Sequence, residues 1–150
     1  MRRVVLAMLV IALLVTVSAP SSAGEKAGKK DEELIQGTWS VVSGEKEGQK
    51  APEEELKDVR LTFAAGGKLM VKAKNKDMEG TYKLDSAKKP KEIDVTVDEG
   101  GKELVLKGIY LLTKDSLKIC LAHPPTERPT EFATQAGVQT MLIIFRRAKE

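Results

Sequence analysis

The chain has 150 residues, and its 25 lysines and arginines against 22 aspartates and glutamates give a formal net charge of +3. The lysines alternate with acidic residues throughout, whereas nucleic-acid binding needs a basic stripe interleaved with aromatics, so nucleic acid is excluded as a partner. The single cysteine, Cys120, excludes a disulfide within the chain, and we expect its thiol to be shielded.

Residues 1–23 have the order of a secretory signal: Arg2 and Arg3, an apolar run from Val4 to Val17, then small residues up to Ala23. The apolar run is shorter than the roughly 20 residues of a membrane-spanning helix. We therefore expect cleavage after Ala23, export to the periplasm or the extracellular space, and no membrane span in the mature chain. An uncleaved membrane anchor is the competing interpretation.

Residues 24–30 are charged and contain glycine, which predicts a flexible leader before one domain over residues 31–150. Asp31 can cap a short helix, "DEELIQ", whose apolar face is Leu34 and Ile35. The last predicted strand, "TMLIIFRR", is apolar on both faces. We expect the helix to cover the outer side of that strand.

From Thr38 onward, apolar and polar residues alternate with the period of two that is typical of β-strands. The predicted strands are "GTWSVVS", "VRLTFA", "KLMVKAK", "GTYKLD", "EIDVTVD", "ELVLKGIYLL", "DSLKICLA" and "TMLIIFRR". Most connections are short, so successive strands should be antiparallel neighbours, and closure would remove the exposed edges. The sequence predicts an all-β fold, a small eight-stranded antiparallel barrel with the short helix near its first and last strands.

Glycine stands two residues before an aromatic residue at three strand starts, in the pairs Gly37 with Trp39, Gly80 with Tyr82, and Gly108 with Tyr110. A glycine inside a strand marks a bend or a close approach of backbones. The residue two positions later points to the same face. We expect these glycines to let the barrel wall coil while the aromatic rings fill the adjacent space.

The order Gly37-Thr38-Trp39 after a short helix, with Arg146 and Arg147 closing the last strand, resembles the lipocalin pattern, in which a late arginine packs across the tryptophan at the closed barrel end. A longer set of residues is similar to an exported, uncharacterised lipocalin-like domain family abundant in planctomycete bacteria. The residues that carry this resemblance include Gly37, Trp39, Gly80, Tyr82, Gly108, Tyr110, Cys120, Arg128, Phe132 and Arg146. The resemblance implies a lipocalin-like barrel and export, with no activity to transfer.

No set of residues has the spacing of a known catalytic motif. Motifs of the types HExxH, GxSxG, GxGxxG and GxxxxGK[ST] are missing from the sequence, and His123 is the only histidine. Cys120 and His123 have an odd spacing that sends them to opposite strand faces unless the chain bends. Glu92, Asp94 and Asp98 share an outward face, where pairing with lysines is expected. We expect no enzyme, metal or cofactor; a hydrolase that uses Cys120 with His123, or these carboxylates, is the alternative.

The long segment "HPPTERPTEFATQAG" contributes a charge, Arg128, and an aromatic ring, Phe132. Either these side chains rim the barrel mouth, or Phe132 plugs the barrel end while Arg128 caps carbonyls or pairs with an acid. The first interpretation makes Tyr82, Tyr110, Arg128 and Phe132 the candidate ligand-binding residues.

An eight-stranded barrel is near the size at which inward side chains either fill the interior or leave room for one small ligand. The predicted inward set is Trp39, Val41, Leu61, Phe63, Leu69, Val71, Tyr82, Leu84, Ile93, Val95, Val97, Leu117, Ile119 and Leu121. Two functions follow. The first is an exported carrier of a small apolar molecule, and the alternative is a filled barrel that acts as a protein-interaction or structural module of the cell envelope. For both we expect a monomer.

Overall fold

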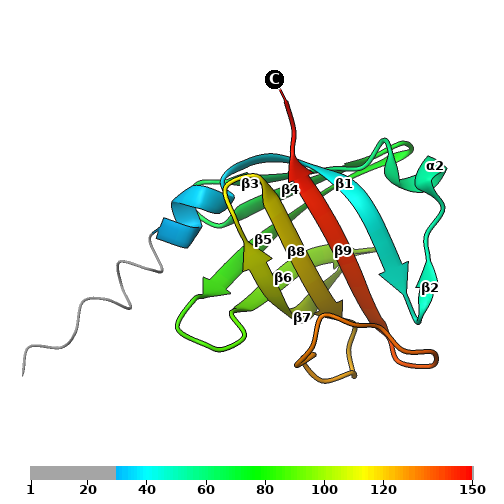
Figure 1. Cartoon of the computed structure of the whole chain (residues 1–150). Coiled ribbons are helices and arrows are strands. Elements are labelled where there is room, and N and C mark those ends of the chain that lie inside the picture. Colours follow the sequence, from blue (N-terminus) through cyan, green and yellow to red (C-terminus); the bar gives the residue numbers. More distant parts are fainter. Residues whose placement is uncertain (1–29, 150) are drawn as a thin grey trace, which may run out of the picture.

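The strands form one antiparallel sheet that closes on itself in the computed structural model, which describes residues 30–149 (Figure 1). The strands are β1 (Gly37–Lys46), β2 (Gln49–Lys50), β3 (Arg60–Ala64), β4 (Lys68–Ala73), β5 (Lys76–Asp85), β6 (Glu92–Glu99), β7 (Lys102–Leu112), β8 (Ser116–Ala122) and β9 (Thr140–Arg147). Strands β3 to β9 pair in chain order, and β1 pairs with both β3 and β9. The two-residue β2 extends a hairpin from the end of β1 and stands outside this ring. The predicted eight-stranded antiparallel, lipocalin-like barrel is confirmed.

The predicted secretory signal, residues 1–23, and the predicted leader up to residue 29 lie outside the described residues. A helix occupies residues 30–35, and a second short helix, α2 (Glu53–Leu56), lies between β2 and β3. In the described part of the chain, neither helix has the length and apolar character needed to cross a membrane.

The barrel has two different ends. At one end, which we call the closed end, β1 begins at Gly37 and β9 ends at Arg147. The helix over residues 30–35 lies at this end (Figure 1), and Ile35 is fully buried in the same apolar cluster as Trp39. The indole Nε1 of Trp39 donates a hydrogen bond of 2.8 Å to the Ile35 carbonyl oxygen. The opposite end, where β1 ends at Lys46, is called the mouth.

The prediction that the N-terminal helix covers the outer side of the last strand is wrong. Ile35 enters the barrel end, and the outer face of β8 is instead contacted by the loop over residues 123–139. The Cys120 thiol, on the outer face opposite Leu142, lies 3.7 Å from the Ala133 carbonyl oxygen of this loop. A six-residue helix with one apolar face buries that face more completely in a barrel end than on a flat wall.

The expected close approach of backbones at the strand glycines is confirmed. A Cβ atom at Gly80 would lie 2.2 Å from the Thr96 carbonyl oxygen, and one at Gly108 would lie 2.3 Å from the Cys120 carbonyl oxygen. Both distances are far inside van der Waals contact. The barrel wall can therefore coil as tightly as it does only where the side chain is missing.

We expect Gly80→Ala to lower the free energy of unfolding by about 1–3 kcal/mol, because the new methyl group must push the backbone of β6 away. Thr81→Ala, which changes the exposed neighbouring residue, should change the free energy by less than about 0.5 kcal/mol. Urea unfolding followed by Trp39 fluorescence measures both. Equal stability of the Gly80→Ala and Thr81→Ala variants would contradict the close approach.

Candidate functional site

The closed end is sealed by Arg147. Its guanidinium carbon lies 4.2 Å from the centroid of the Trp39 ring, and its nitrogens donate hydrogen bonds to the carbonyl oxygens of Leu34 and Gln36. The resemblance therefore applies to Arg147, whereas Arg146, the arginine that we assigned to the signature, is exposed. Gly37 has φ of +118°, and a Cβ atom there would lie 2.9 Å from Arg147 Nη1. The positive φ favours glycine at this position, and the missing side chain leaves room for the guanidinium.

A buried carboxylate holds the N-terminal helix from the other side. Asp31 is 6% exposed, and its Oδ2 accepts hydrogen bonds of 2.7 Å from the Tyr110 hydroxyl and from Lys91 Nζ. Burial, and then the hydrogen bond to this carboxylate, raise the pKa of Tyr110 far above its ordinary value. Asp31, which we expected as the helix cap, lies one residue inside the helix. Tyr110, a candidate ligand-binding residue, is engaged at the closed end.

Above this seal the barrel encloses an apolar cavity of about 200 Å³. Every side chain that lines it is aliphatic, a methionine or a phenylalanine. The lining residues are Val41, Val59, Leu61, Phe63, Leu69, Val71, Met78, Val95, Val97, Leu106, Ile119, Leu121, Met141, Ile143 and Phe145. Nine of them belong to the predicted inward set, and those missed include Met141 and Phe145. Both come from β9, which is apolar on both faces, so that alternation cannot identify its inner face.

Tyr82 points into the barrel but does not line the cavity. Its ring meets Phe63 edge-on, with centroids 4.9 Å apart, and its hydroxyl donates a hydrogen bond of 3.0 Å to the Ala64 carbonyl oxygen. Burial raises the pKa of Tyr82. Because this hydroxyl already donates its proton to the protein, Tyr82 offers no free donor to a ligand.

Arg128 does not rim the mouth; it fastens the 123–139 loop to the outer wall. Its Nη1 donates hydrogen bonds to the carbonyl oxygens of Gly108 (2.8 Å) and Ile93 (3.2 Å), and Nη2 lies 2.6 Å from Asp94 Oδ1. Glu92 forms a longer ion pair with Arg128, in which Oε1 lies 3.6 Å from Nε. The alternative in which Arg128 caps carbonyls and pairs with an acid is therefore the correct one. Glu92 and Asp94 pair with Arg128 in place of the lysines that we expected, and Asp98 accepts a hydrogen bond from the Gly101 amide.

Phe132 neither plugs the barrel nor lines the mouth. It belongs to the same loop, and Lys118 Nζ, on the outward face of β8, lies 5.7 Å from the centroid of its ring. Thr134 further fastens the loop, since its hydroxyl donates to Glu45 and accepts from the Gly48 amide. The four candidate ligand-binding residues are thus distributed between the closed end, the inner wall and the outer face.

Cys120 and His123 are not hydrogen-bonded to each other. Cys120 is fully buried beneath the loop, and this burial raises the pKa of its thiol. His123 is exposed, and its Nδ1 lies 2.8 Å from the Pro124 carbonyl oxygen. Within residues 30–149, no cluster of three or more histidine, cysteine, aspartate or glutamate side chains is positioned to hold a metal ion.

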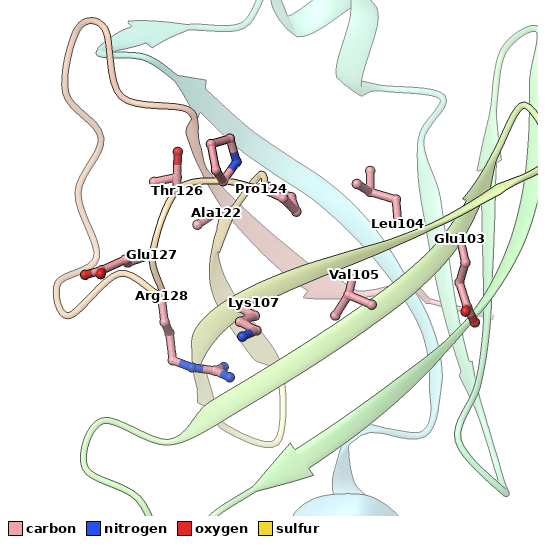
Figure 2. A pocket seen from close by; sticks show the side chains of 10 residues that line it. Glu103, Leu104, Val105, Lys107, Ala122, Pro124, Thr126, Glu127 and Arg128 are labelled. Atoms are coloured by element: carbon pink, nitrogen blue, oxygen red, sulfur yellow. The ribbon is translucent and has the colours of Figure 1, made fainter.

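Two surface hollows lie near the mouth. The larger, of about 660 Å³, is an open outer groove between β7 and the start of the 123–139 loop, and Figure 2 shows its lining side chains, which include Val105, Lys107 and Glu127. The smaller, of about 140 Å³, is a recess lined by Lys46, Glu47, His123, Gln139 and Met141. Met141 also lines the apolar cavity, so this recess adjoins the barrel interior.

Comparison with known proteins assigns no function to the chain. No protein-family model matches the chain, and no curated protein matches it. Among solved structures, a DUF4847 family protein from Bacteroides vulgatus is similar, with a TM-score of 0.49 and 16% sequence identity. The alignment covers 81% of this chain and 99% of that chain. DUF4847 is an uncharacterised family, so the site has to be judged from its own geometry.

We expect Arg128→Gln to speed the labelling of Cys120 by a thiol reagent about tenfold or more in the folded protein. Loss of the charged hydrogen bonds makes opening of the loop easier by about 1.5–3 kcal/mol. Arg146→Gln, which removes an exposed arginine, is the control and should leave the slow native rate unchanged. Stopped-flow or mass-spectrometric labelling measures this, and equal rates in both variants would show that Arg128 does not hold the loop.

Proposed function

We propose that this chain is an exported, lipocalin-like carrier that binds one small apolar molecule inside its barrel. The observation that supports this function is the cavity of about 200 Å³, whose lining is wholly apolar and which lies between a sealed end and a mouth. The proposal includes export by the signal of residues 1–23, membership of the lipocalin-like family that the sequence resembles, action as a monomer, and no enzymatic activity or cofactor.

The size of the cavity limits the ligand. An apolar cavity of about 150 Å³ in another protein stays dry and binds benzene, whereas drug-sized ligands occupy sites of about 300–1,000 Å³. The ligand is therefore about the size of one ring or a short alkyl chain. Each buried methylene contributes roughly 0.8 kcal/mol, so such a molecule binds mainly through its apolar area.

A second candidate function rests on the outer groove of about 660 Å³. Val105 is 39% exposed there and is flanked by Glu103 and Lys107, a combination that suits a protein surface with both apolar and charged groups. On this alternative the barrel is an interaction module of the cell envelope. This function requires a partner protein, and substitutions inside the cavity would not change the binding of that partner.

We expect toluene to raise the melting temperature of the protein in a saturable manner, because it binds only the folded state. Val41→Phe places a ring in the cavity and should weaken toluene binding about tenfold or more. Val42→Phe, the same change at the adjacent residue, which is 46% exposed on the outer face, should leave binding unchanged. Thermal unfolding without ligand shows whether each variant folds, and the milder Val97→Leu provides a second cavity variant. If toluene raises the melting temperature equally in all the folded variants, the carrier function is rejected.

A further inference from the structure

Lysines occupy inward positions where the barrel wall meets the mouth. Lys46, the last residue of β1, pairs with Met141, which lines the cavity. Residues directly opposite each other in an antiparallel pair point to the same face. The pairing therefore places Lys46 on the inner face of the wall, at its rim.

Two other lysines occupy equivalent positions. Lys76 begins β5 and stands two residues before Met78, a cavity residue. Lys102 begins β7 and stands two residues before Leu104, which packs against the core. Because side chains alternate along a strand, both lysines are in inward register at the same end of the barrel as Lys46. We call Lys46, Lys76 and Lys102 the rim lysines.

In inward register at this rim, the three lysines outnumber the acidic residues. Glu99 is the acid in inward register beside Lys102, and Glu47 contributes to the recess next to Lys46. The salt bridges found within residues 30–149 use Lys91 and Arg128, so none of them engages a rim lysine. The glutamates of α2 are exposed, while its Leu56 packs toward Gly44. The rim lysines are therefore free to meet a ligand.

The recess provides space for a polar group beside this charge. It is lined by Lys46, Glu47, His123 and Gln139, and it shares Met141 with the apolar cavity. A molecule with its apolar part among the valines and leucines of the interior would therefore present its other end to lysine and imidazole side chains. The interior itself has no charged or hydrogen-bonding side chain in its lining, so any orientation must come from the rim.

We propose that the ligand is a small amphiphile with one short apolar tail, held in the cavity, and one anionic head group, held at the mouth by the rim lysines. This inference rests on the proposed carrier function. A carboxylate and a phosphate monoester share the required chemistry, because both accept hydrogen bonds from ammonium groups and carry negative charge. Each ion pair at an exposed position contributes little, so the three lysines together favour the anion by roughly tenfold.

The test compares hexanoate, hexyl phosphate and 1-hexanol, which carry the same tail, by titration calorimetry on the whole chain. The rim variant is Lys46→Gln with Lys76→Gln and Lys102→Gln. The control variant, Lys50→Gln with Lys72→Gln and Lys107→Gln, removes the same charge from outward positions, where these lysines stand opposite Glu45, Asp77 and Asp94 on the neighbouring strands. We expect the rim variant to lose about tenfold in affinity for hexanoate or hexyl phosphate and to keep its affinity for 1-hexanol. The control variant should bind all three probes with the affinity of the original protein.

The outcomes separate this inference from the proposed function. If all three probes bind, and Val41→Phe weakens them, but the rim variant binds the anions as well as the control variant does, the anionic head is wrong and the carrier stands. A preference for 1-hexanol over both anions leads to the same conclusion. If no probe binds, or if binding is insensitive to Val41→Phe, the carrier function fails and the inference fails with it. Selective loss of hexanoate or of hexyl phosphate in the rim variant identifies which head group the mouth prefers.

Discussion

The contact of Arg147 with Trp39 is the interaction on which the organisation of the barrel depends. It joins the last strand to the first, and the same guanidinium binds two carbonyl groups of the N-terminal segment, at Leu34 and Gln36. A planar guanidinium can stack on an indole and donate several hydrogen bonds at once, which a lysine cannot do. With one end sealed in this way, the apolar interior is closed on that side.

The unfilled cavity lowers the stability of the folded barrel, which bears on whether a ligand fills it. Leaving buried apolar volume unfilled costs on the order of a few kcal/mol for a space of this size, against a total stability of about 5–15 kcal/mol for a typical domain. A barrel with a purely structural role could remove this cost by replacing Val41, Val71 or Val97 with larger residues. The medium-sized lining is instead consistent with a space that a ligand fills, and the lysines at its rim are consistent with a ligand that has a charged end.

Much of the fold could be predicted from sequence, because alternation reports directly which strands have one apolar face. The closed end was also predictable from Gly37 and Trp39. The inner face of β9 was not, since that strand is apolar on both sides. This is why Met141 and Phe145 were missed, and why Arg146 was assigned to the signature in place of Arg147. The course of the 123–139 loop could not be predicted either, because its anchor, Arg128, binds backbone carbonyls that no residue pattern identifies. Lys102 stands two residues before the apolar Leu104, so alternation along the strand could have placed this lysine on the inner face.

Methyl-detected NMR during titration with 1-hexanol tests most directly whether the apolar interior is the binding site. The account predicts saturable shifts of the methyl groups of Val71, Val95 and Ile119, which line or face the cavity, together with unchanged signals from the outward Val105 and Leu111. Shifts confined to Val105 and its neighbours in the outer groove, with the interior methyl groups unaffected, would contradict it.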